Sequence, residues 1–205
     1  MKRILMFDAI PMFGGSKVAN AELIKQCEQR GVISYVATTH PEHWTKIFRS
    51  DSRVEIIKIK RSPISSHHGV SYWLMSIFYF IQLFLATLKL PKLDWLVGLS
   101  SPNNDMPLYL LRLFTRKPIV QMVHGLVGAS RISGYCLVKA YSIYYLDNTR
   151  DSMVDALAMY LKIPKHAVYQ FWPTLNTSSF VNGLSSQRKT KQSNPITQRV
   201  IRAAS

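Results

Sequence analysis

An uncharged stretch of 19 residues, from Val70 to Leu88, limits what this chain can fold into more than any other feature. As a helix that rises about 1.5 Å per residue, the stretch would nearly cross a hydrocarbon core of roughly 30 Å. Taken by itself, it therefore favours a membrane-spanning helix. Whether that interpretation holds depends on the segments that flank the stretch.

Short apolar runs that are typical of buried strands lie on both sides of this stretch. A membrane-spanning helix would separate the early strands from the later ones and leave two half-sheets with unpaired edges. We therefore predict one α/β domain: a Rossmann-like, doubly wound, mainly parallel sheet with helices on both faces, in which residues 70–88 cover the sheet. Strands are predicted at 4–7, 33–39, 54–60 (a partly alternating edge strand), 94–100, 118–124, 142–147 and 168–172, and further helices at 18–30, 106–114 and 152–161.

The helix at 70–88 has few polar residues, and these do not form one broad solvent-facing stripe. We therefore expect its outer side to contact a membrane interface or a partner. Lys89 and Lys92 are placed to meet lipid headgroups, although a solvated helix end explains them equally well. The candidates for the outer side include Tyr72, Trp73, Phe78, Tyr79 and Phe84.

The chain carries 26 Lys and Arg against 11 Asp and Glu, which gives a formal net charge of +15. This balance favours phosphate-bearing partners: nucleic acid, an anionic membrane surface or a nucleotide-linked substrate. An apolar share of 47% excludes a disordered chain. Cys27 and Cys136 lie far apart without metal-ligand spacing, so we expect no disulfide framework, no zinc site and a reduced cytosolic compartment.

The last part of the chain differs in composition from the rest. Residues 184–198 are rich in Ser, Gln, Lys, Thr and Asn, which is typical of a linker. Residues 199–205 then resemble the opening of another strand. We expect residues 1–180 to form one domain, and residues 181–205 to be a basic linker and the first strand of a C-terminal domain that this chain lacks.

A glycine turn follows the first predicted strand. Gly14 and Gly15 would let a ligand approach the backbone closely, and Ser16 lies at the start of a helix whose free N–H groups and dipole favour phosphate. The order matches neither GxGxxG nor GxxxxGK[ST], so a dinucleotide site and a P-loop are disfavoured. The alternative is that the two glycines only make a tight strand-to-helix turn.

A single histidine, His124, ends the predicted strand at 118–124. In an open α/β sheet the carboxyl ends of the strands face the ligand crevice, where the glycine turn also lies. A neutral imidazole at that place can hydrogen-bond to sugar hydroxyls. The alternative is an ordinary hydrogen-bonded histidine in a strand-end turn.

Further polar residues follow other strands of the predicted sheet. Asn103 and Arg150 come after the strands at 94–100 and 142–147, so both reach the same edge and could hydrogen-bond an acceptor. Helix capping by the neighbouring Asn104 or Asp151 is an equally good explanation. The adjacent pair at 67–68, two histidines, points in two directions without a third ligand, so no metal site is expected.

Three segments together resemble the N-terminal half of a family 4 glycosyltransferase, an enzyme of two Rossmann-like domains in the GT-B architecture. They are FGGSKVANAELIKQCEQRG at 13–31, PIVQMVHGL at 118–126 and YYLDNTRDSMVDALAMYLKIPKHAVYQFWPTLNTSSF at 144–180. The resemblance covers residues 1 to about 180. It implies transfer of a sugar from a nucleotide-sugar donor with retention of anomeric configuration and without a required metal or other cofactor.

The resemblance also implies roles for individual residues. Gly14 and Gly15, with Ser16, would approach the donor diphosphate, and His124 would contact the donor sugar near the reaction centre. Acceptor selectivity would come from loops of this half, with Asn103 and Arg150 as candidates. We expect the acceptor to be a cell-surface polysaccharide or lipid-linked glycan, and the protein to be cytoplasmic and peripheral on the inner face of the membrane.

The chain also departs from the family pattern. Residues 172–180 occupy the place of the family's interdomain turn, but they contain neither its glycine nor its aspartate. The diphosphate clamp and the Glu-x7-Glu pair belong to the absent domain, so this chain alone is expected not to turn over. Two alternatives remain: a basic nucleic-acid-binding module, disfavoured because the tail has no interleaved aromatics, and a membrane-anchored α/β protein without catalysis.

Overall fold

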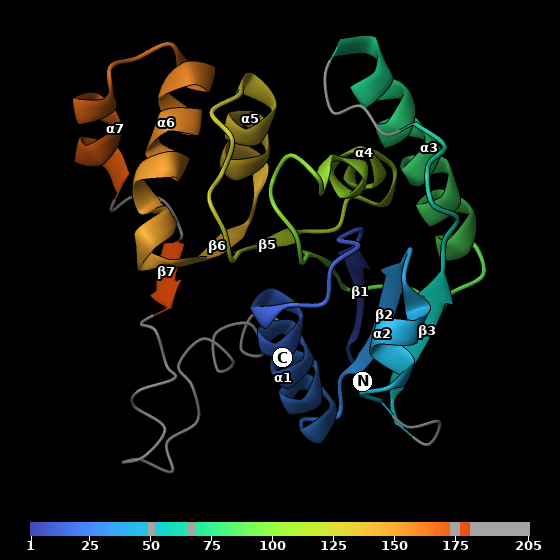
Figure 1. Ribbon diagram of the computed structural model, residues 1–205. Coiled ribbons are helices and arrows are strands. Elements are labelled where there is room, and N and C mark those ends of the chain that lie inside the picture. Colours follow the sequence, from blue (N-terminus) through green and yellow to red (C-terminus); the bar gives the residue numbers. More distant parts are fainter. Residues whose placement is uncertain (49–51, 65–68, 173–176, 181–205) are drawn as a thin grey trace, which may run out of the picture.

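The computed structural model describes residues 1–48, 52–64, 69–172 and 177–180 (Figure 1). Within them, seven parallel strands form one sheet in the order β3-β2-β1-β4-β5-β6-β7. The chain therefore winds outward from β1 to one side and from β4 to the other, which is the doubly wound arrangement. The strands are β1 (Arg3–Asp8), β2 (Ile33–Thr38), β3 (Val54–Lys58), β4 (Trp95–Gly98), β5 (Ile119–Val123), β6 (Ser142–Leu146) and β7 (Thr177–Phe180).

Helices cover both faces of this sheet, which confirms the predicted α/β, Rossmann-like fold class (Figure 1). Alternate residues of a strand point to opposite faces. On one face Ile4 and Met6 pack with α1 and α2, whereas Leu5 and Phe7 on the other face pack with α3 and α4. The helices are α1 (Gly15–Gln29), α2 (Pro41–Thr45), α3 (Gly69–Thr87), α4 (Met106–Thr115), α5 (Arg131–Lys139), α6 (Arg150–Leu161) and α7 (Lys165–Phe171), with a 3-10 turn at Asp147–Thr149.

The uncharged stretch forms α3, which lies on the sheet as expected. Among the described residues it is long and apolar enough to cross a bilayer by length and composition alone. One side of it is nevertheless buried on the sheet through Met75 and Leu83. Tyr72 and Tyr79 belong to that buried side, so placing them on the outer side was wrong. Each instead hydrogen-bonds inward, Tyr72 to the carbonyl oxygen of Asn103 and Tyr79 to the amide of Ser62.

The prediction of a strand at 168–172 was also wrong. These residues belong to α7 and the turn after it, and Val168 and Trp172, four residues apart, are buried on the same side. Pro164 is the N-cap residue of this helix, and its carbonyl oxygen accepts from the backbone amides of Ala167 and Val168. The last strand is Thr177–Phe180, which lies in the segment assigned to an interdomain turn and pairs with β6. Residues 181–205, the predicted linker and additional strand, lie outside the described residues.

Close packing of α5 on α6 depends on Gly134, which is buried in the middle of α5. A Cβ atom at this position would collide with the backbone oxygen of Ala156 and with Cβ of Tyr160, both in α6. Backbone cannot move aside as the end of a flexible side chain can. The two helices therefore approach each other only because residue 134 has no side chain.

We predict that Gly134→Ala lowers the free energy of unfolding by about 1–3 kcal/mol, because the overpacked helices must separate. Urea denaturation followed by circular dichroism measures the change. Gly128→Ala is the matched control, since a Cβ at Gly128 meets nothing within 4 Å, and it should stay within about 0.5 kcal/mol of the wild type. Equal stabilities for the two variants would contradict this packing.

Candidate functional site

The loops that follow the carboxyl ends of β1, β4, β5 and β6 lie along one edge of the parallel sheet, and we call residues 9–14, 99–105, 124–130 and 147–149 the carboxyl rim. The strand order reverses direction between β1 and β4. Ligands of open α/β sheets bind in the crevice at such a switch point. The glycine turn and His124 both belong to this part of the molecule, on two strands that only β4 separates.

The glycine turn ends at α1, which begins at Gly15. Gly14 is extended, with a φ of −159°, and its carbonyl oxygen accepts from the backbone amides of Lys17 and Val18. Gly14 and Gly15 are exposed, and a Cβ atom at either would meet nothing within 4 Å. Neither glycine has a positive φ. The described fold therefore does not require glycine at either position, which disfavours the alternative that the two glycines serve only a tight turn.

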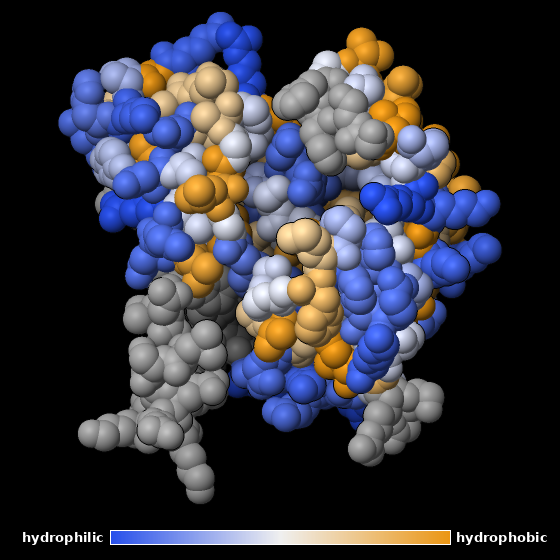
Figure 2. Space-filling model, viewed as in Figure 1, coloured by the Kyte–Doolittle hydropathy of each residue, from blue (hydrophilic) through white to orange (hydrophobic). Residues whose placement is uncertain are grey.

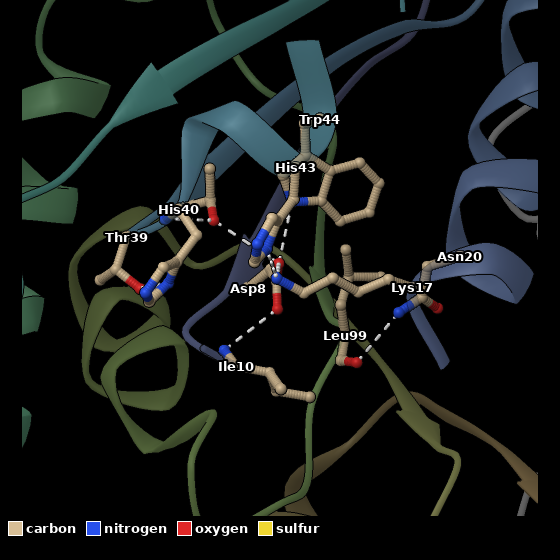
Figure 3. Close-up of polar contacts among 10 residues, drawn as sticks. Asp8, Ile10, Lys17, Asn20, Thr39, His40, His43, Trp44 and Leu99 are labelled. Carbon is tan, nitrogen blue, oxygen red and sulfur yellow. Dashed lines mark hydrogen bonds and ion pairs between the residues drawn. The ribbon is translucent and has the colours of Figure 1, made fainter. Parts of the chain in front are cut away.

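His124 is joined to α1 by a hydrogen bond. Its Nε2 lies 2.7 Å from Oδ1 of Asn20, a fully buried residue of α1. Asn20 Nδ2 in turn donates to the carbonyl oxygen of Leu99, at 3.1 Å, just after β4 (Figure 3). Val120 and Met122 of β5 face α1, so the alternation of the strand directs residue 124 to the same side. Asn20 thus ties together the ends of β4 and β5 and the start of α1.

The hydrogen bonds of Asn20 also fix the protonation of His124. Because Nδ2 of Asn20 donates to Leu99, its Oδ1 must accept, and His124 Nε2 carries the proton. Burial lowers the pKa of His124 to about 4, so the imidazole is neutral at pH 7. Nδ1 is then the acceptor nitrogen of the ring. The sequence did not single out Asn20, whose position on α1 gives no sign of this contact.

A buried ion pair lies beside this group, between Asp8 at the end of β1 and Lys17 in the first turn of α1 (Figure 3). Lys17 Nζ is 3.2 Å from Asp8 Oδ2, and both side chains are 1% exposed. The indole of Trp44 also donates to this oxygen, at 2.8 Å, and the amide of Ile10 donates to Oδ1. Lys17 donates in addition to Nδ1 of His43, at 2.9 Å. The pair thereby fixes α1 and α2 to the end of β1.

The histidines near this pair connect it to the surface. His43 stacks on His40, with ring centroids 5.4 Å apart, and Phe13 of the glycine turn contacts His43 edge-on. Phe13 is exposed, whereas Lys17 is buried. Sequence reasoning missed this cluster, although one signal was available, because Asp8 directly follows the apolar run at 4–7.

A second polar group lies under the rim between β4 and β5, around Asp105. Its Oδ2 accepts from Nε2 of Gln121, at 2.7 Å, and from the amide of Ser100, at 3.1 Å. Gln121 Oε1 accepts in turn from the hydroxyl of Tyr109. A side chain on Gly98 could not share this space, since its Cβ would lie 2.5 Å from Asp105 Oδ2. Burial raises the pKa of Asp105 to about 8, so the carboxyl is mostly protonated at pH 7.

The raised pKa of Asp105 predicts a specific pH dependence of stability. In the unfolded chain this carboxyl ionises near pH 3.9, whereas in the folded protein it ionises near pH 8. The contribution of Asp105 to stability should therefore be full below about pH 4 and fall as the pH rises towards 8, by about 2–3 kcal/mol between pH 5 and pH 7. Asp105→Asn, which cannot ionise, should remove this part of the pH dependence.

Urea denaturation at several pH values measures this effect in both proteins. Asp147→Asn, on the exposed turn after β6, is the matched control and should keep the slope of the wild type. Parallel stability curves for the wild type and Asp105→Asn would show that residue 105 is ionised in the folded protein.

The two acceptor candidates lie on either side of His124 along the rim. Asn103 is in the loop after β4, and Arg150 opens α6 after β6, while β5 lies between those strands. The guanidinium of Arg150 is 5.5 Å from the ring centroids of both Tyr169 and Trp172. Such cation–π contacts hold the charged group towards α7. No side-chain oxygen caps α4 or α6, so capping by Asn104 or Asp151 was wrong.

Metal ligands do not gather in the described part of the chain. Among those residues no three His, Cys, Asp or Glu side chains are placed to hold one ion. The histidine pair at 67–68 lies outside the described residues.

Comparison with known proteins shows which fold this is. A scan against protein-family models gives no match, and a search of curated protein sequences gives none either. Among solved structures, Anabaena Alr3699/HepE in complex with UDP-glucose is 12% identical, with a TM-score of 0.55 over 99% of this chain and 50% of that one. Sucrose-phosphate synthase from Thermosynechococcus elongatus is 10% identical, with a TM-score of 0.58 over 87% of this chain and 47% of that one.

The lipopolysaccharide outer core galactosyltransferase WaaB is also similar, at 12% identity and a TM-score of 0.52 over 87% of this chain and 44% of that one. The chain thus has the Rossmann-like fold found in glycosyltransferases of the GT-B architecture. It spans about half the length of the structures that it matches.

Proposed function

We propose that this chain is the acceptor-side half of a retaining, family 4-like glycosyltransferase that uses a nucleotide-sugar donor. Solved structures of this fold include a complex with UDP-glucose, which supports a nucleotide sugar as the donor. The identities are low, so the fold alone carries this support, and the reaction is argued from the site.

The observation that carries the proposal is the convergence of two features on the carboxyl rim. Gly14 and Gly15 are exposed glycines that the fold does not need, at the start of a helix. His124 is a neutral imidazole linked to the same helix through Asn20. A diphosphate at the helix start would receive backbone N–H groups and a favourable dipole, and missing side chains would let it approach closely.

The proposed roles follow from these positions. Ser16, half-buried in the first turn of α1, joins the two glycines in binding the donor diphosphate. His124, whose Nε2 proton is held by Asn20, lies beside the transferred sugar with its charge suppressed. Asn103 and Arg150, on either side of His124, contact a polysaccharide or lipid-linked glycan acceptor. The reaction is proposed to need no metal, and the protein to act at the cytoplasmic face of a membrane.

In this arrangement the residues of the chain bind and orient the substrates, while the leaving nucleotide needs positive charge beside the glycine turn. The guanidinium of Arg150 is held towards α7 instead. Lys17, which follows the glycine turn closely in the sequence, is already paired with Asp8. The electrostatic stabilisation of the departing diphosphate is therefore assigned to a second domain, and the chain alone is proposed to be inactive.

The experiment compares Gly14→Ala/Gly15→Ala with the wild type in the protein encoded by the complete reading frame that contains these residues. Transfer is measured as nucleotide released from a panel of UDP-, GDP- and ADP-sugars. We expect thermal stability to be unchanged and the release rate to fall at least tenfold. Ala19→Gly, at an exposed position of α1, is the control and should keep the wild-type release rate. Failure of every donor, or a stability loss that accounts for the lost rate, would overturn the proposal.

A further inference from the structure

The outer side of α3 is apolar and exposed over its whole length. Trp73, Leu74, Ile77, Ile81 and Leu85 recur at helical spacing and are between 42% and 53% exposed. In Figure 2 the upper right side of the molecule, where Figure 1 shows α3, carries hydrophobic residues (orange) beside strongly hydrophilic ones (blue). Isolated exposed apolar residues need no explanation, but a continuous row of them does.

This row continues onto α4. Phe114 stacks on Phe80 and contacts Phe84, both of α3, and Leu113 and Phe114 are 64% and 63% exposed. We call the exposed row of α3 together with these two residues of α4 the apolar face. Its underside is fixed to the sheet, because Met75 and Leu83 of α3 are buried in the core. α3 therefore lies flat along the molecule.

A positively charged hollow of about 370 Å³ adjoins the apolar face between α4 and α5. None of the described residues that line it is acidic. Arg112 donates to the carbonyl oxygen of Lys139, which joins the two helix ends. Leu113 belongs to both the hollow and the apolar face, so the two are continuous. The lining residues are Tyr109, Arg112, Leu113, Arg116, Tyr135 and Lys139.

We infer that the apolar face and this hollow together bind the surface of an anionic lipid bilayer. The apolar side chains would enter the interfacial region, while Arg112, Arg116 and Lys139 contact acidic headgroups. Charge favours an anionic bilayer over a second copy of this chain as the partner of this surface. A second copy would bring another set of the same cations, and another net charge of +15, to the interface. A spanning α3 would have to leave the sheet and expose its core.

This inference does not depend on the proposed function, but it places the rim near the membrane. The start of α3 reaches the rim, because the Tyr72 hydroxyl donates to the carbonyl oxygen of Asn103, at 2.8 Å. A bilayer along α3 would therefore lie close to one of the acceptor candidates.

Co-sedimentation with vesicles of phosphatidylcholine containing 30 mol% phosphatidylglycerol, against pure phosphatidylcholine, tests the inference on the full chain. The wild type should bind the anionic vesicles and detach in carbonate. Arg116→Asn/Lys139→Gln removes two cations and should weaken binding about 30-fold, at about 1 kcal/mol for each cation near the surface. Asparagine tolerates the left-handed backbone of Arg116, whose φ is 55°.

Lys162→Asn/Lys25→Gln is the matched control. It removes the same amount of charge as the test variant. Lys162 ends α6 in a left-handed conformation, as Arg116 ends α4, and Lys25 is exposed on α1, as Lys139 is on α5. It should bind within about twofold of the wild type. Ile77→Glu/Ile81→Glu should lose at least tenfold in binding and keep its circular dichroism spectrum.

Three results would overturn the inference. The first is an equal loss of binding in the charge variant and its matched control, which would indicate unspecific attraction. The second is resistance to carbonate, which would indicate a spanning helix. The third is a wild type that is dimeric and an Ile77→Glu/Ile81→Glu variant that is monomeric, with neither protein binding vesicles. This result would assign the apolar face to a second copy of the chain.

Discussion

Lys17→Met is expected to lower the free energy of unfolding by about 3–5 kcal/mol, because it leaves the buried carboxylate of Asp8 without its cation. Asp8 is 1% exposed, and the indole of Trp44 and the amide of Ile10 are neutral donors that do not replace the ammonium group. Methionine fills most of the volume of the lysine stem, so the loss reports mainly on charge. Urea denaturation at pH 7 measures it.

The double variant Asp8→Asn/Lys17→Met separates charge from packing. It removes both charges, so it should be clearly more stable than Lys17→Met alone. Lys25→Met, on the exposed side of the same helix, is the surface control and should change stability by less than about 0.5 kcal/mol. A double variant less stable than Lys17→Met would show that the ion pair is not what Lys17 contributes.

His124→Ala is expected to lower the rate of sugar transfer about 10²–10³-fold in the protein encoded by the complete reading frame. That is the typical cost of removing one preorganised polar group from the reaction centre. The side chain also holds Asn20, at 2.7 Å, so stability should fall by about 1 kcal/mol. Nucleotide release at saturating donor gives the rate, and thermal unfolding gives the stability.

Two further variants test whether the lost rate of His124→Ala is due to the imidazole of His124 itself. His166→Ala, on the exposed surface of α7, should keep the wild-type rate. Asn20→Ala should lower the rate less than His124→Ala, because the imidazole remains but loses the partner that orients it. If His124→Ala transfers sugar at the wild-type rate, His124 is only a structural residue of the strand end.

Much of the fold could be predicted because parallel strands are buried on both faces and stand out as apolar runs. Strands β1, β2, β4, β5 and β6 have this pattern. Within the partly alternating run at 54–60, Val54–Lys58 forms the edge strand β3. The position of His124 near the glycine turn also follows from a general rule, since carboxyl ends of parallel strands share one edge. Predicting this position required only the order of the strands along the chain.

Other features could not be predicted, for physical reasons that differ between them. The run Val168–Trp172 is short, and its apolar residues fit a strand as well as a helix. α3 is apolar all round, so no polar stripe shows which aromatic residues face the sheet, and Tyr72 and Tyr79 were assigned to the wrong side. The burial of Lys17 depends on the distant residues Asp8 and His43, which a local pattern does not contain.

The most direct test of the account is an amide NMR titration of the 205-residue chain with nucleotide sugars at millimolar concentration, because NMR detects even weak binding. For at least one donor, we predict shifts that gather at Gly14, Gly15 and Ser16 and at His124. The opposite edge of the sheet, near Gly31 and Lys117, should stay unchanged. Shifts confined to that opposite edge, or none with any donor, would contradict the central claim that the carboxyl rim binds a nucleotide sugar.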